Sequence, residues 1–121
     1  MYDVIIVGGG ASGLACALTL ASSRGRGWNW AEGKTYLVFD TGESDLHKAY
    51  LKNVPGVQPM TGTQLLEVIR EQIKDWGGVE FSEEKVVEIK KDGEVYKVYT
   101  ETGKEYSAKY VVLAGALRNF P

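Results

Sequence analysis

The chain opens on a short apolar run that predicts a buried strand. Residues 2–7 read Tyr-Asp-Val-Ile-Ile-Val, so four β-branched aliphatic residues follow one another with no polar position between them. A strand that is apolar on both faces is typical of the middle of a parallel sheet covered by helices. We therefore expect a central parallel strand at the start of the chain.

Helical and strand patterns alternate after this strand. Residues 12–21 place apolar side chains along one broad side and predict a helix. Residues 35–40 predict a second strand, which ends in an acid. The segments that follow each of these elements, residues 22–33 and 41–61, show no period and are predicted to be irregular.

A second helix is predicted over residues 61–76. Thr61 and Gln64 have the spacing of a capping box, in which each residue bonds the backbone of the other. Apolar residues then recur at helical spacing, and Gly77-Gly78 supplies a stop signal. Both boundaries of this helix are therefore marked in the sequence.

The pattern changes to β from Val79 onward. Residues 91–94 and 101–104 have the composition of hairpin turns between alternating strands, and residues 110–115 form another apolar strand. The order β-α-β-α-meander-β predicts an α/β protein. We expect a central parallel sheet with a β-meander crossover, in a single domain over residues 1–121.

Composition narrows the classes of function. With 121 residues, 44% of them hydrophobic, the chain has the size and apolar content of one folded domain. A net charge of −2 argues against a general nucleic-acid binder, and no apolar run is long enough for a membrane span. The simplest location for such a chain is the cytoplasm. Cys16 is the one cysteine, so an intrachain disulfide is excluded.

A glycine-rich turn follows the first strand and opens the first helix. It reads Gly8-x-Gly10-x-x-Gly13, a spacing that is weak alone but stands here in the strand–turn–helix context that dinucleotide binding requires. The glycines allow a tight turn, close approach of a pyrophosphate and close packing of helix on strand. The helix N-terminus then offers N–H groups and a positive dipole end to the phosphates.

Asp40 closes the second strand, where a carboxylate can accept hydrogen bonds from an adenosine ribose. It follows Gly13 by 27 residues, more than the spacing of about 20 in the usual fingerprint. The irregular segment 22–33 accounts for the excess. A carboxylate here also repels a ribose 2′-phosphate, which disfavours NADP. The competing interpretation, turn glycines and a solvated acid, explains less of this context.

The sequence resembles the FAD-dependent pyridine nucleotide-disulphide oxidoreductases, most closely the thioredoxin reductase-like proteins. Three segments carry the resemblance in order: the loop at residues 2–13, Asn53-Val54-Pro55-Gly56, and Val111-Val112-Leu113-Ala114-Gly115-Ala116. The second is similar to the family's Asn-aromatic-Pro-Gly element, and the third to its second flavin-contacting segment. The combination implies a Rossmann-like FAD/NAD(P)-binding fold for the α/β domain of residues 1–121. It favours FAD, with NAD as the alternative cofactor.

The resemblance implies a set of cofactor-binding residues. The turn would hold the pyrophosphate, the end of the second strand the ribose, and a backbone group after Val79 the adenine, while the other two segments would approach the flavin. By position these residues are Gly8, Gly10, Ala11, Ser12 and Gly13 for the pyrophosphate, Asp40 and Thr41 for the ribose, Lys85 or Val86 for the adenine, and Asn53, Ala114 and Gly115 near the flavin.

The chain departs from this family in two ways that bear on its reaction. It has no Cys-x-x-Cys pair and no inserted NAD(P)H domain. We therefore expect a small FAD-binding oxidoreductase-type module, without a redox-active disulphide, whose electrons come from an external donor such as free NAD(P)H or a redox partner protein. The alternatives are a non-catalytic dinucleotide-binding or interaction module and a plain NAD-binding domain.

Few side chains stand out as chemical groups in their own right. His47 is the one histidine and has no partners at ligand spacing, so no metal site and no catalytic acid or base is predicted. Cys16 has the position of a small core residue. Trp28 and Trp30 suggest a subunit interface or a cover for the adenosine. We expect a homodimer, with no nucleic-acid and no membrane partner.

Overall fold

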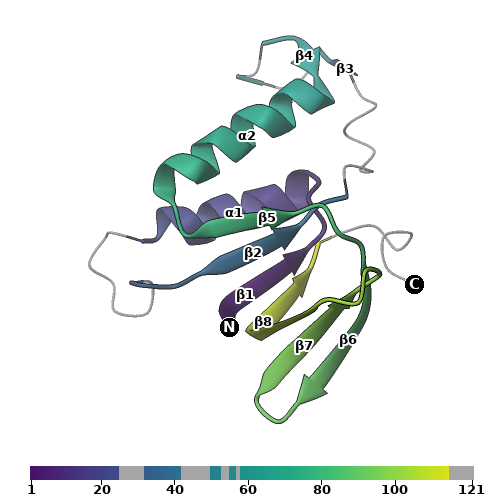
Figure 1. The fold of residues 1–121 in the computed structure, drawn as a ribbon. Helices are drawn as coiled ribbons and strands as arrows, with labels where there is room; N and C mark the ends of the chain where they lie inside the picture. The colour runs from purple at the N-terminus through teal and green to yellow at the C-terminus, as the bar shows by residue number, and fades with distance from the viewer. Residues whose placement is uncertain (25–31, 42–49, 53–54, 57, 115–121) are drawn as a thin grey trace.

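The computed structural model describes residues 1–24, 32–41, 50–52, 55–56 and 58–114. Within them, two helices and eight strands follow one another along the chain (Figure 1). They are β1 (Tyr2–Val7), α1 (Ala11–Ser22), β2 (Tyr36–Phe39), β3 (Tyr50–Leu51), β4 (Met60–Thr61), α2 (Gly62–Trp76), β5 (Val79–Ser82), β6 (Val86–Asp92), β7 (Val95–Thr100) and β8 (Glu105–Leu113).

The predicted central sheet and meander are both present, and they share one strand. The sheet has the order β5-β2-β1-β8-β7-β6, in which β5, β2, β1 and β8 are parallel and β8, β7 and β6 are antiparallel. Residues 105–108 of β8 pair with β7, whereas residues 108–113 pair with β1. The final strand predicted at 110–115 is therefore the second half of the meander's last strand.

The two faces of the parallel strands have different covers. Ile6 and Val38 pack against α1 and α2, whereas Ile5 and Leu37 pack against the meander, because successive side chains of a strand point to opposite faces. Figure 1 shows both helices on one side of β1 and β2, with β6 and β7 on the other. The expectation that helices cover this sheet therefore holds for one face, and the meander covers the second.

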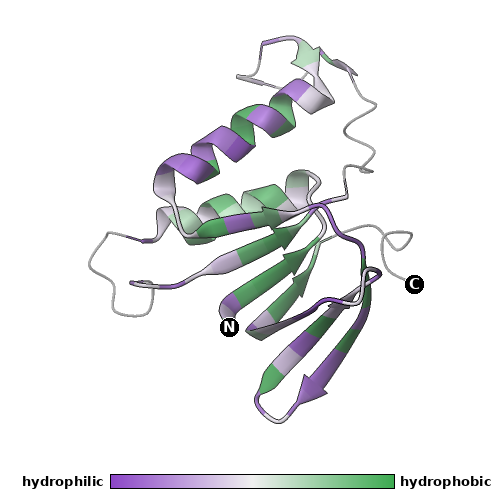
Figure 2. Cartoon of the chain, in the orientation of Figure 1, coloured by the Kyte–Doolittle hydropathy of each residue, from purple (hydrophilic) through white to green (hydrophobic). Residues whose placement is uncertain are grey.

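The two helices have different surfaces. α1 is apolar around most of its circumference, and one of its alanines, Ala15, is exposed. Polar and apolar residues alternate around α2 (Figure 2). The capping box of α2 is confirmed: the Gln64 N–H donates to Thr61 Oγ1 at 3.1 Å and the Thr61 N–H donates to Gln64 Oε1 at 2.9 Å. Gly77 ends the helix with a φ of 79°.

Among the described residues before α2 is a short strand pair that the sequence pattern does not predict. β3 and β4 pair antiparallel, Tyr50 with Thr61 and Leu51 with Met60, although residues 41–61 are predicted to be irregular. Strands of two residues are too short to show an alternating pattern, so the sequence carries no signal for them. No helix in the described part of the chain is long and apolar enough to span a membrane.

Candidate functional site

The turn between β1 and α1 lies at the carboxyl end of the parallel strands. The Gly8 N–H donates to the Phe39 carbonyl at 2.9 Å, which ties the turn to the end of β2. Gly10 is the N-cap of α1, with no hydrogen bond from a cap side chain and no acidic residue in the first turn of the helix. The N-terminus of α2, by contrast, is closed by the side chains of Thr61 and Gln64. The first N–H groups of α2 are therefore capped by side chains, whereas α1 has no side-chain cap.

Gly13 packs so closely on the turn that no side chain fits there. A Cβ at this position would lie 1.7 Å from the Gly8 carbonyl oxygen and 3.5 Å from the Cβ of Ala114. Ala114 itself donates its N–H to the Val7 carbonyl at 2.9 Å. The structure therefore brings together Gly8, Gly13 and Ala114, which the sequence places at opposite ends of the chain.

Asp40 follows β2 and is 5% exposed. Its N–H donates to the Ser82 carbonyl at 2.8 Å, and its side chain lies directly against Gly9, where a Cβ would come within 2.1 Å of the carboxyl carbon. Gly9 is thus required by the close approach of the acid. The motif Gly-x-Gly treats this position as variable, so no sequence signal singles out Gly9.

Arg70 of α2 is a second residue that sequence reasoning missed. Its Nη2 lies 2.5 Å from Oδ2 of Asp40, and its guanidinium carbon lies 4.7 Å from the ring centre of Phe81. Arg70 stands four residues after Leu66 and three before Ile73, both of which are buried. A charged residue in line with a buried helix stripe was the signal that could have identified it.

An open pocket of about 200 Å³ lies beside this ion pair. It is bounded by the end of β2, the first half of α2 and the segment after β5; its lining residues are Asp40, Thr41, Thr63, Leu66, Glu67, Arg70 and Glu83. Most of the lining is polar, and the pocket is smaller than the roughly 300–1,000 Å³ of sites that enclose a whole drug-sized ligand. It therefore has room for part of a nucleotide.

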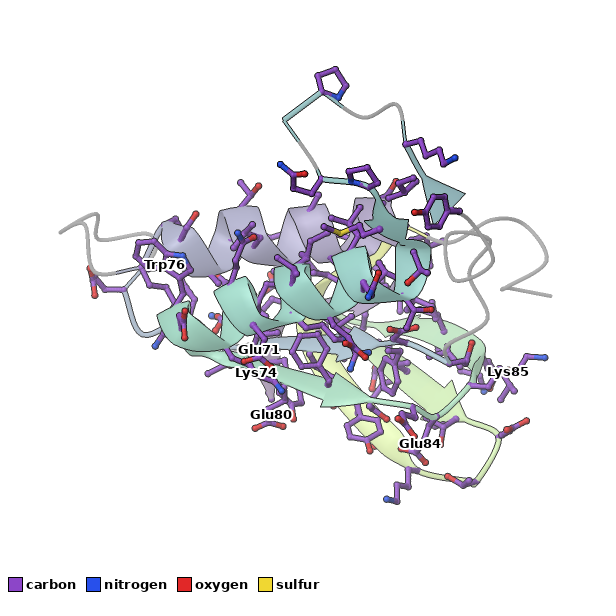
Figure 3. The ribbon with its side chains drawn as sticks, turned by 90° about the horizontal axis from the view of Figure 1, so that it is seen from above. Glu71, Lys74, Trp76, Glu80, Glu84 and Lys85 are labelled. Atoms are coloured by element: carbon purple, nitrogen blue, oxygen red, sulfur yellow. The ribbon has the colours of Figure 1, made fainter. Side chains whose placement is uncertain are left out.

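The segment between β5 and β6 is fixed to the meander by Glu84. This carboxylate accepts hydrogen bonds from Tyr106 Oη at 2.9 Å and Thr100 Oγ1 at 3.2 Å, and from the Thr102 hydroxyl. The Thr102 hydrogen bond is the main cause that holds the pKa of Glu84 below its usual range. Figure 3 shows Glu84 and Lys85 together, at the end of the molecule opposite Trp76.

The two candidates for the adenine contact have different surroundings. Lys85 is exposed, and its carbonyl accepts the Glu101 N–H at 2.9 Å. The side chain of Val86 is 2% exposed and belongs to the core between sheet and meander, so only its backbone is suited to a ligand. No described contact joins either residue to the glycine turn, and the adenine assignment stays a prediction.

The glycine turn, Asp40 and the meander all lie within a segment that matches a known protein family. The family described as "Pyridine nucleotide-disulphide oxidoreductase" matches residues 3–115, which include the turn, Asp40, both helices and the whole meander. The chain belongs to this family.

Relatives in the pyridine nucleotide-disulphide oxidoreductase family agree with this assignment. A thioredoxin reductase of Aquifex aeolicus is 36% identical over 94% of this chain and 33% of its own length. A ferredoxin–NADP reductase of Lysinibacillus sphaericus is 28% identical, again over 94% of this chain and 32% of its own. The chain thus spans about a third of the length of these relatives.

A solved thioredoxin reductase from Gloeobacter violaceus has the same fold. It is 32% identical, with a TM-score of 0.75 over 93% of this chain and 35% of its own. The chain therefore resembles the flavin-binding domain of thioredoxin reductases.

The remaining predicted residues divide into exposed ones and ones outside the described residues. Ala11, Ser12 and Thr41 are exposed around the turn and the pocket. Outside the described residues lie Asn53, Gly115, His47, Trp28 and Trp30. Burial raises the pKa of the Cys16 thiol. In the described part of the chain, no group of three or more His, Cys, Asp or Glu side chains is placed to hold a metal ion.

Proposed function

We propose that this chain binds FAD, with the pyrophosphate on the glycine turn and the start of α1. The observation that carries the proposal is the start of α1 itself. Gly10 caps the helix without a side chain, no acid lies in the first turn, and Gly13 leaves the backbone bare. Helix N–H groups in such an arrangement favour an anionic ligand. FAD supplies two phosphates at the required position.

The proposed roles of the other residues follow from their places around this turn. Asp40 accepts hydrogen bonds from the adenosine ribose, with Thr41 beside it. Ala114 lies against Gly13 and therefore near the cofactor that the turn would hold. FAD is favoured over NAD because the family match continues through Ala114.

The chemistry of the proposed site belongs mainly to its cofactor. When bound, FAD supplies a ring that takes up and passes on a hydride or electrons. The residues of this chain bind and orient the nucleotide, and we assign none of them a proton transfer. Electrons come from an external donor, either free NAD(P)H or a redox partner protein. Because Cys16 is the one cysteine, an exchange between two thiols of this chain is not part of the proposal.

The test begins with the absorbance spectrum of the purified chain after incubation with FAD and gel filtration. We expect a flavin spectrum that travels with the protein. Addition of NADH or NADPH without oxygen should bleach it, as FAD and NADH with a proton give FADH2 and NAD⁺. A chain that retains no flavin would overturn the proposal. Flavin that stays oxidised with every donor would overturn the oxidoreductase role and leave the second candidate, a non-catalytic nucleotide-binding module.

Substitutions at Ser12 test the position of the pyrophosphate. Ser12→Asp adds a carboxylate to the first turn of α1, which stabilises a helix but repels phosphates. We expect FAD affinity to fall by at least about tenfold, since like charges close together cost on the order of 1.4 kcal/mol or more in a partly dry site. The neutral Ser12→Asn variant is the matched control and should bind within about threefold of the wild type. Equal affinities of both variants would place the phosphates elsewhere.

The homodimer also remains a proposal. Sedimentation at micromolar concentration, with and without FAD, tests it directly. A single species at twice the chain mass of 13.3 kDa is the expected result, and a stable monomer under both conditions would overturn it.

A further inference from the structure

Arg70 connects three elements at the proposed nucleotide site. It comes from the middle of α2, forms an ion pair with Asp40 after β2, and lies over the ring of Phe81 in β5. The stacking on Phe81 limits where the guanidinium can go, and the planar fork of an arginine suits a carboxylate better than the point charge of a lysine. Arg70 therefore holds the Oδ2 side of the Asp40 carboxylate in one place.

The backbone of the glycine turn also confines the Asp40 side chain, at its carboxyl carbon and at the same Oδ2. The carboxyl group lies against Gly9 so closely that a Cβ on Gly9 would be 2.5 Å from Oδ2. The Asp40 N–H is bonded to Ser82, the residue after Phe81. The side chain is thus held between the glycine turn and the guanidinium, which leaves it little freedom to rotate.

The ion pair forms part of the wall of the pocket described above. Asp40 and Arg70 both line this space of about 200 Å³, together with Thr41 and Glu67. The pocket lies at the carboxyl end of β2, where ligands bind in open parallel sheets. A sugar-sized group that enters it meets a carboxylate whose orientation is already set.

We infer that Arg70 is a positioning residue for ribose recognition: by orienting Asp40 it makes the site select an adenosine ribose over a 2′-deoxyribose. The inference rests on the proposed function, because Asp40 must receive the sugar. An ordered acceptor forms a stronger hydrogen bond to a ribose hydroxyl than one that must first lose rotational freedom. A purely structural ion pair between α2 and β2 would instead affect both sugars equally.

The experiment measures the affinity of the full chain for ADP and for 2′-deoxy-ADP by calorimetry. In the wild type we expect ADP to bind about tenfold more tightly, the effect of one hydrogen bond to a charged acceptor. Arg70→Met should reduce this ratio to about twofold, mainly by weakening ADP. Arg70→Lys keeps the charge but loses the planar contact, so its ratio should lie between the two.

Lys74→Met is the matched control. Lys74 lies one helical turn beyond Arg70, pairs with Glu71 and is exposed, so its removal changes the charge of α2 by the same amount. Its ADP to 2′-deoxy-ADP ratio should equal that of the wild type. Thermal unfolding of each variant shows whether it is folded.

The outcomes separate this inference from the proposed function. If the wild type prefers ADP and Arg70→Met and Arg70→Lys keep that full preference, Arg70 has no positioning role and only this inference is overturned. If the folded wild type binds FAD but does not distinguish the two sugars, both the positioning role of Arg70 and ribose recognition by Asp40 are overturned, and FAD binding stands. If it binds neither FAD nor ADP, the proposed function fails as well.

Discussion

The two ends of the parallel sheet each carry an aspartate, and the two residues have opposite surroundings. At the amino end, Asp3 accepts the Thr35 N–H at 2.8 Å and lies 3.7 Å from Lys34 Nζ and 3.6 Å from Lys109 Nζ. At the carboxyl end, Asp40 is more deeply buried and lies between a bare glycine turn and the guanidinium of Arg70. Both acids are paired with cations, but only one stands beside an uncapped helix.

The difference shows how the same residue type serves stability at one end and ligand binding at the other. Asp3 joins the start of β1 to the residue before β2, and Tyr2 beside it donates a hydrogen bond to Glu80. Burial and this hydrogen bond raise the pKa of Tyr2 to about 12. The amino end is therefore closed by its own side chains, whereas the N–H groups at the start of α1 have no side-chain cap.

The largest expected effect comes from adding a methyl group to the glycine turn. Gly13→Ala forces a Cβ against the Gly8 carbonyl, a backbone atom that cannot move aside, and we expect a loss of more than about 3 kcal/mol of unfolding free energy. Gly33→Ala is the counterpart before β2, with a φ of 71° but open space around it, and should cost about 1 kcal/mol. Urea unfolding of both variants measures the difference. Equal losses would show that the turn tolerates a side chain.

Exchange of each aspartate for asparagine should separate the two ends by function. Asp40→Asn removes the charged ribose acceptor, so FAD and ADP affinity should fall by about tenfold or more. Asp3→Asn weakens bonds at the closed end and should cost about 1–2 kcal/mol of unfolding free energy with unchanged nucleotide affinity. Calorimetric titration and urea unfolding of both variants test this. Loss of nucleotide affinity in Asp3→Asn would contradict the division.

The acid dependence of stability should identify Asp3 as a structural carboxylate. Burial raises the pKa of Asp3, but the hydrogen bond from the Thr35 N–H and the charges of the two lysines together lower it by more. The folded pKa therefore lies below the usual value of 3.8. A lowered folded pKa stabilises the protein above the unfolded pKa, and this contribution is lost as the pH falls through the folded pKa. Asp3→Asn should therefore lose less stability than the wild type below about pH 4.

Urea unfolding between pH 7 and pH 2.5 measures this slope. Glu84→Gln is a second variant with the same expected sign, because hydrogen bonds, chiefly that of Thr102, hold the pKa of Glu84 low as well. Curves of Asp3→Asn and Glu84→Gln that run parallel to the wild type in acid would contradict the assignment.

The smallest effect is expected for the cations at the closed end. Lys109 is half exposed and contributes one of two lysines near Asp3. Lys109→Met should change the unfolding free energy by less than about 0.5 kcal/mol and leave ADP affinity unchanged, as is usual for exposed ion pairs. The same urea unfolding measures this change. A loss above about 1 kcal/mol would contradict the prediction and show that the Lys109–Asp3 pair matters more than exposed ion pairs usually do.

Local signals in the sequence determined most of the fold. The apolar run at residues 4–7, the capping box of Thr61 and Gln64, and the turn residues at 91–94 each act over a few positions, so their structures follow from nearby residues. The strand–turn–helix context of the glycine turn is local in the same sense. These elements are confirmed with shifts of one or two residues at their ends.

The tertiary structure decided which distant residues share the site. Gly9 must lack a side chain because Asp40 fills its space, and Arg70 belongs to the site because α2 packs along the end of β2. No local pattern states either contact, since the partners are about 30 residues apart in the sequence. The meander covers one face of the sheet for a similar reason: apolar residues at alternate positions require a cover but do not specify whether it is helix or strand. The sequence by itself thus determined both helices, most of the strands and the turn, because their signals are local, and the packing decided how the acid at the end of β2 is held.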